Sequence, residues 1–155
     1  MKHPALTYRQ MSVQGATPLS LVVMLYDRAI AALHGAIAAI EAHDIEKKCH
    51  HLCRALAIIA QLEGSLNFEL GGEVAQTLQT LYMYARAQAM KANLENSADI
   101  LRALIENLTT VRDAWREGER RLAAQSTAGS SDGQRAQKDL LDAGTMESLP
   151  SRWTV

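Results

Sequence analysis

The chain has 155 residues, of which 48% are hydrophobic, and its formal net charge is −1. Such a chain fits one domain of ordinary size with a real apolar core. The nearly neutral charge gives no general electrostatic basis for binding nucleic acid or an anionic membrane. The adjacent arginines Arg120 and Arg121 are flanked by Glu117 and Glu119, which indicates a solvated helix face, so we predict that the protein binds no nucleic acid.

Residues 1–16 form the first segment and show no sustained hydrophobic period. They contain Pro4 and Gly15 together with the scattered apolar residues Leu6, Tyr8, Met11 and Val13. We predict an irregular or partly helical N-terminal arm, whose Tyr8 and Met11 rest against the bundle when no partner is bound. The segment carries no apolar signal core, which favours a cytoplasmic location.

Residues 17–42 predict one long and unusually apolar helix. Thr17 can cap its first free N–H groups, and Pro18 suits the first helical position. One stripe recurs at steps of three and four and includes Leu19, Val22, Tyr26, Ala29, Leu33, Ala36 and Ile40. Further apolar rows flank this stripe, so the helix is either buried centrally in a bundle or presents one stripe to a partner. Asp27 and Arg28 interrupt the apolar run short of the about 20 residues that a bilayer requires, so we predict no membrane insertion.

Two more helices follow. Asp44 is a candidate N-cap for a helix that continues to about Phe68, and Gly71 with Gly72 supplies the tight reversal after it. The next helix is predicted over residues 73–93. Tyr82 and Tyr84 cannot both face inward, and we expect Tyr84 to be exposed.

The fourth helix has the clearest stripe. Asn96 and Asp99 resemble a capping box, and the apolar residues that follow are Leu101, Leu104, Leu108, Val111 and Trp115. From Gln125 onward the composition shifts to Ser, Thr, Gly and Gln, which predicts a flexible, disordered tail over residues 125–155. The predicted fold is therefore all-α: an antiparallel up-down four-helix bundle over residues 17–124, with an N-terminal arm and a flexible C-terminal tail.

The densest polar cluster is Cys49-His50-His51-Leu52-Cys53. Thiolate and imidazole are preferred zinc ligands, but on a helix His50 and His51 point away from the face that the cysteines share. We expect the cysteines to be reduced, small core residues. A metal-binding bundle that recruits His34 or His43 stays open as an alternative.

The same stretch raises phosphotransfer as a second alternative. Histidine phosphotransfer domains are four-helix bundles with a motif like His-x-Leu-Lys-Gly. Here His50-His51-Leu52 is followed by Cys53 and Arg54 in place of the lysine and glycine. No phosphate loop, nucleophile elbow or Ser-His-Asp set is evident, so we predict neither an enzyme nor a cofactor.

The chain also resembles the flagellar secretion chaperone family, FliS, over roughly residues 8–117. The N-terminal pattern consists of Tyr8, Val13, Thr17-Pro18, Leu21 and Met24-Leu25-Tyr26-Asp27. The second helix and its glycine turn match at Ile58-Ile59, Leu62, Ser65-Leu66 and Gly71-Gly72-Glu73. Later matches are Leu81-Tyr82, Tyr84, Ala92-Asn93, Val111-Arg112 and Ala114-Trp115.

This resemblance implies a cytoplasmic, non-enzymatic chaperone. Its partner would be the disordered C-terminal segment of flagellin, which it keeps from polymerising prematurely and presents to components of the flagellar export apparatus. An amphipathic segment would lie in an apolar groove, for which flexible methionines are well suited. The expected partner-binding residues are Tyr8, Met11, Val13, Leu21, Met24, Leu25, Met83, Tyr84 and Met90.

Overall fold

The computed structural model describes residues 18–142, with side chains as far as Thr127. Every element in this part of the chain is a helix. The helices are α2 (Pro18–Glu41), α3 (Ile45–Gly64), α4 (Phe68–Glu95) and α5 (Ala98–Asp142). The predicted arm, with Leu6, Tyr8, Met11 and Val13, lies outside the described residues, as does the proposed cap Thr17.

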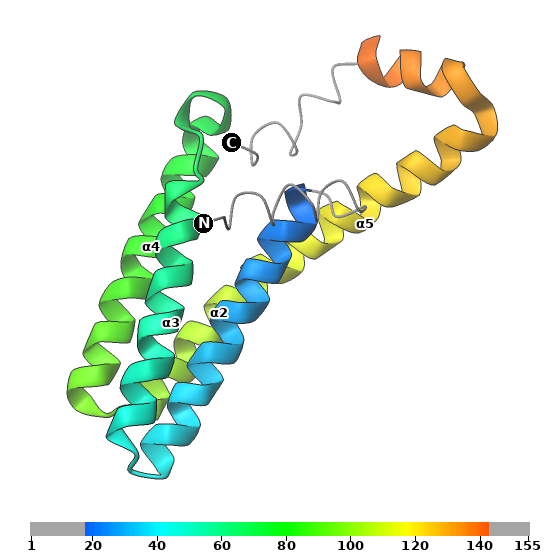
Figure 1. Ribbon diagram of the computed structural model, residues 1–155. Helices are drawn as coiled ribbons and strands as arrows, with labels where there is room; N and C mark the ends of the chain where they lie inside the picture. The colour runs from blue at the N-terminus through cyan, green and yellow to red at the C-terminus, as the bar shows by residue number, and fades with distance from the viewer. Residues whose placement is uncertain (1–17, 143–155) are drawn as a thin grey trace, which may run out of the picture.

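The four helices form an antiparallel up-down bundle, as predicted (Figure 1). Helix α2 packs against α3 and α5, and α4 packs against the same two helices. Helices α2 and α4 are therefore diagonal partners across the core. Short connections at residues 42–44, 65–67 and 96–97 make each helix antiparallel to the next.

Helix α2 is the central helix of the core. Its buried residues come from all three apolar rows and include Tyr26, Leu33 and Ala36, each 0% exposed. By length and apolar content α2 could cross a membrane, so the expectation that Asp27 and Arg28 exclude a span was too strict. Half of its apolar window is buried inside the bundle, as is usual for a core helix.

Helix α3 starts where the sequence predicts but ends earlier than predicted. Asp44 accepts a hydrogen bond from the Lys47 N–H at 3.0 Å, which confirms the N-cap. However, α3 ends at Gly64, and Asn67 caps α4 by accepting from the Leu70 N–H at 3.1 Å. The predicted reversal at Gly71 and Gly72 is therefore wrong. Gly72 does adopt a positive φ of 51°, but it kinks α4 instead of ending a helix.

The turn between α4 and α5 is shifted by one residue from the predicted capping box. Asn96 is left-handed, with φ 50°, and ends α4. Ser97 begins α5, because its hydroxyl oxygen accepts a hydrogen bond from the Ile100 N–H at 3.3 Å.

Helix α5 continues to Asp142, well beyond the predicted end at Ala124. Its buried residues are Leu101, Leu104, Ile105, Leu108 and Trp115, and Leu122 is partly buried against the core. Residues 123–127 are exposed. Among the side chains that the structure describes, Leu122 is thus the last one packed on the core, whereas residues 125–142, predicted to be a flexible tail, continue the helix.

Candidate partner-binding surface

Exposed apolar side chains are concentrated on α4. Among the described residues, eight large apolar side chains are exposed, and six of them belong to this helix. The six are Phe68, Leu70, Met83, Tyr84, Met90 and Leu94. Monomeric proteins rarely gather so many on one element without using them, so α4 is the strongest candidate for a docking surface.

Four of the exposed residues of α4 share one side of the helix. Met83, Ala87, Met90 and Leu94 follow one another at steps of four, three and four, and we call this set the α4 stripe. Met83 is 55%, Met90 59% and Leu94 83% exposed. Beyond the buried Tyr82, the inward side of the same helix carries the small residues Ala85, Ala89 and Ala92.

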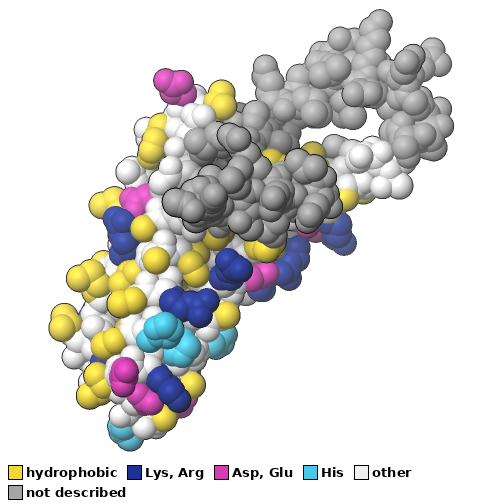
Figure 2. Space-filling view, viewed as in Figure 1, with side chains coloured by type: hydrophobic (Ala, Val, Ile, Leu, Met, Phe, Trp, Pro, Cys, Tyr) yellow, Lys and Arg dark blue, Asp and Glu magenta, His cyan; other side chains and the backbone are white. Residues whose placement is uncertain are grey.

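The α4 stripe borders α3. Arg86, close to the stripe, forms an ion pair with Glu63 of α3. Figure 2 shows hydrophobic side chains gathered over the face that α3 and α4 form. Cys49 and Cys53 of α3 are both free and exposed, so the expectation that they are core residues is wrong. A ligand that lies on the α4 stripe therefore meets α3 at its edge.

The predicted contact residues that the structure describes lie on two helices, α2 and α4. Met83, Tyr84 and Met90 lie together on α4, and Tyr84 is 46% exposed while Tyr82 is buried, as expected. On α2, Met24 is 36% exposed and Leu21 is half-buried. Because α2 and α4 are diagonal, these two groups lie on different sides of the bundle.

Three of the remaining calls lie outside the described residues, namely Tyr8, Met11 and Val13. The last, Leu25, is only 8% exposed, so its side chain belongs to the core and not to a partner surface. Leu94 was missed by the sequence analysis. Its spacing from Met83 and Met90 is the signal that could have found it.

The Leu-Tyr-Asp pattern of residues 25–27 has a structural role. The hydroxyl groups of Tyr26 and Tyr82 lie 2.7 Å apart in a buried hydrogen bond that joins α2 to α4. Burial raises the pKa of the Tyr26 phenol, although hydrogen bonds with Tyr82 and Trp115 partly oppose this. Burial likewise raises the pKa of Tyr82 far above that of an ordinary tyrosine.

Asp27 completes this pattern by joining α2 to α5. Its carboxylate accepts hydrogen bonds from Arg112 at 2.9 Å and Arg116 at 3.3 Å. The adjacent Arg28 is exposed. The residues that carry the family resemblance most clearly therefore hold the bundle together.

The histidines do not assemble a metal centre. Within the described residues, no group of three or more His, Cys, Asp or Glu side chains could hold a metal ion. His50 and His51 meet edge to face, with ring centroids 5.8 Å apart. His51 packs on Gly35, where an added Cβ would lie 2.6 Å from the ring. Gly35 thus allows α2 and α3 to approach closely.

An α-helical bundle with a spare apolar surface is typical of a protein that binds other polypeptides. Comparison with known proteins agrees, because the family model described as flagellar protein FliS matches residues 1–121. The chain belongs to the FliS family. The predicted family is therefore confirmed.

Curated relatives of this chain are named flagellar secretion chaperones. The flagellar secretion chaperone FliS of Bacillus subtilis is 32% identical over 117 residues, which cover 76% of this chain and 86% of the relative. The Salmonella typhimurium protein of the same name is 35% identical over 71% of this chain and 85% of its own length. That of Campylobacter jejuni is 34% identical over 71% and 86%. Proteins named as chaperones are not enzymes, in agreement with the predicted lack of catalysis.

Proposed function

We propose that this protein binds the C-terminal segment of flagellin in the cytoplasm, prevents its premature polymerisation and presents it to the flagellar export apparatus. Membership of the FliS family supports an export chaperone in general. The observation that favours a docked polypeptide is the apolar surface that the α4 stripe and Tyr84 expose on α4.

The chemistry of the α4 stripe suits an amphipathic segment. Met83 and Met90 have unbranched, polarisable side chains that repack easily against different neighbours. A helix whose apolar residues also recur at steps of three and four can lay them along this stripe. Fully burying one methionine stabilises a complex by about 1.5–3 kcal/mol before the ordering cost of the ligand, so a few such contacts are needed.

A disordered segment can also reach the second exposed apolar site. Leu21 and Met24 lie on α2, on another side of the bundle, and a ligand that is unfolded alone can wrap around such a surface. The arm residues Tyr8, Met11 and Val13 precede α2 and are proposed to act near this site. Deletion of residues 1–15 weakens binding if they contact flagellin directly, and strengthens it if they only cover the site.

The proposal is tested with a double variant of the α4 stripe. Met83→Ser combined with Met90→Ser should weaken binding of a flagellin C-terminal peptide at least about tenfold in calorimetry, because two buried methionine contacts are lost. The matched control changes two exposed alanines of α2, Ala31→Ser and Ala38→Ser, and should leave affinity unchanged.

Two further measurements show whether a change in affinity reflects lost contacts on α4 or a loss of folding. Both double variants should keep the unfolding midpoint of the parent, since the substituted side chains are exposed. Binding to the parent should show a clearly negative heat-capacity change, the sign of buried apolar surface. Unchanged affinity of the methionine double variant would exclude α4 as the docking helix.

A further inference from the structure

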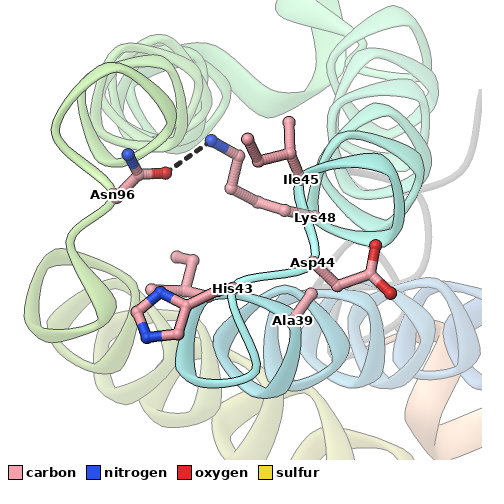
Figure 3. A pocket seen from close by; sticks show the side chains of 7 residues that line it. Ala39, His43, Asp44, Ile45, Lys48 and Asn96 are labelled. Atoms are coloured by element: carbon pink, nitrogen blue, oxygen red, sulfur yellow. Dashed lines mark hydrogen bonds between the residues drawn. The ribbon is translucent and has the colours of Figure 1, made fainter.

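A pocket of about 340 Å³ lies at the end of the bundle where the α2–α3 turn meets the α4–α5 turn. Ala39 and Ile40 of α2 and Ile45 of α3 form its apolar walls. Its polar lining includes Lys48 and Asn96, which face each other across the pocket (Figure 3). Nothing in the fold of the bundle by itself requires an open pocket here.

Lys48 is the one buried charged side chain among the described residues, with 6% exposure. Its ammonium donates to the Asn93 carbonyl oxygen at 3.1 Å and to Asn96 Oδ1 at 2.6 Å. Both acceptors are neutral, and the negative end of the α4 dipole supplies only partial compensation. An ammonium has three N–H donors, so one more acceptor can be accommodated.

The carboxylate that lines the same pocket does not neutralise Lys48. Asp44 also lines the pocket, but it accepts from the Lys47 N–H and lies 3.9 Å from the Lys47 ammonium. Figure 3 shows its carboxylate turned away from Lys48. No ion pair involves Lys48 within residues 18–127, so a buried cation is left without an anionic partner, which is costly in a protein interior.

The pocket lies beside the end of α4 at which the α4 stripe ends. Leu94, the last residue of the stripe, is 83% exposed and precedes Asn96 by two positions. Ile45, which lines the pocket, is 69% exposed. A polypeptide that lies along the stripe toward the end of α4 would therefore bring its own end to Lys48.

We propose that this pocket binds the terminal α-carboxylate of the flagellin segment, an inference that rests on the function proposed above. Lys48 donates a charge-assisted hydrogen bond to the carboxylate, and the Asn96 amide can add its N–H₂ group. The bound segment then runs parallel to α4, with its C-terminal end at the α4–α5 turn. If the segment is helical there, the negative end of its dipole also faces the ammonium.

The test compares two synthetic peptides of the flagellin C-terminal segment, one with a free C-terminal carboxylate and one with a C-terminal amide. With the full-length parent protein, the amide should bind at least about tenfold more weakly, as expected for the loss of one charge-assisted hydrogen bond. The difference should persist at high salt, because a buried pair is little screened.

Two lysine variants assign the effect to the pocket. In Lys48→Met, the carboxylate and amide peptides should bind equally, since the cation is gone. In the control Lys47→Met, whose native side chain is 74% exposed, the tenfold difference should remain. Equal affinity of the two peptides for the parent would overturn the carboxylate site and leave the proposed function standing, whereas failure of both to bind would overturn both.

Discussion

Helices α2 and α4 lie diagonally opposite each other and use their apolar residues in opposite ways. Helix α2 is the more apolar of the two, yet Met24 is its only exposed large apolar side chain. Helix α4 buries small residues such as Ala85, Ala89 and Ala92 and exposes six large apolar side chains, two of them methionines. The exposed apolar surface is therefore on α4, the helix whose sequence is the less apolar of the two.

This difference teaches that apolar content does not by itself locate a binding surface. The several apolar rows of α2 suggested spare surface for a partner. In the bundle, however, α3 and α5 cover two sides of α2, and a third side faces the core. What exposes a residue is its angular position relative to the neighbouring helices, which is a property of the packing.

The largest expected difference in unfolding free energy is between a substitution in the core around α2 and one on the surface of α4. Trp115 is 6% exposed and belongs to the same core cluster as Tyr26 of α2, so Trp115→Ala should lower the free energy of unfolding by about 3–5 kcal/mol. Met90→Ala on the α4 stripe should change it by less than about 0.5 kcal/mol. Urea unfolding of both variants measures the contrast, and similar losses would show that Met90 is packed.

The next prediction concerns the link between the two helices. Tyr82→Phe removes the Tyr82 hydroxyl from its buried hydrogen bond with Tyr26 and should cost about 1–3 kcal/mol of unfolding free energy. The double change Tyr26→Phe with Tyr82→Phe should cost less than the sum of the single changes, because both polar groups leave together. Additive losses would mean that the two hydroxyls do not interact.

The same pair predicts alkaline destabilisation. Burial raises the pKa of both phenols above the ordinary tyrosine value of 10.0. The unfolded chain therefore loses these protons first, so the stabilising contribution is complete below about pH 10 and is lost as pH rises further. Unfolding free energies measured on either side of pH 10 should show this fall, and the double phenylalanine variant should lack most of it.

A smaller effect tests how closely α3 covers α2. An added Cβ at Gly35 would meet the His51 ring at 2.6 Å, so Gly35→Ala should cost about 1–3 kcal/mol through overpacking. Gly64→Ala in α3 has nothing within 4 Å and should be neutral or stabilising by up to about 1 kcal/mol. Thermal unfolding of the two variants compares them, and a neutral Gly35→Ala would mean that α2 and α3 separate easily.

The smallest effect is expected from truncation after Ala124. Leu122 is the last residue described as packed against the core, and residues 123–127 are exposed. The shortened protein should therefore keep its unfolding midpoint and lose helical signal only in proportion to the removed part of α5. A clearly lower midpoint would show that a later residue docks on the bundle.

The helices and their core could be predicted because both follow from the helical period. Leu101, Leu104, Leu108 and Trp115 of the last stripe are buried as the spacing indicates, and so are Leu33 and Ala36 of the first. Asp44 could be identified because capping is a local interaction. The positions of the turns could not be predicted to the residue where neighbouring residues can each cap a helix. Asn96 and Ser97 can each cap a helix, and Asn67 provides an earlier start that turns Gly72 into a kink.

The candidate site could be predicted only in part. Met83 and Met90 are apolar residues that are as typical of a core as of a surface, so their exposure does not follow from their residue type. The exposure of Cys49 and Cys53 depends on which side of α3 meets α4. The burial of Lys48 depends on the meeting of two turns that are far apart in sequence. Such three-dimensional relationships have no local signal.

The alanines on the inner side of α4 limit which positions of this helix can change during evolution. Ala85 and Ala92 are 0% exposed, so a larger residue there would push the helices apart, and glycine would weaken the helix. On the outer side, one large apolar residue can replace another at Met83 or Met90 with little effect on folding. One helix can thus conserve its fold through its inner residues while its outer residues adapt to the divergence of whatever sequence it binds.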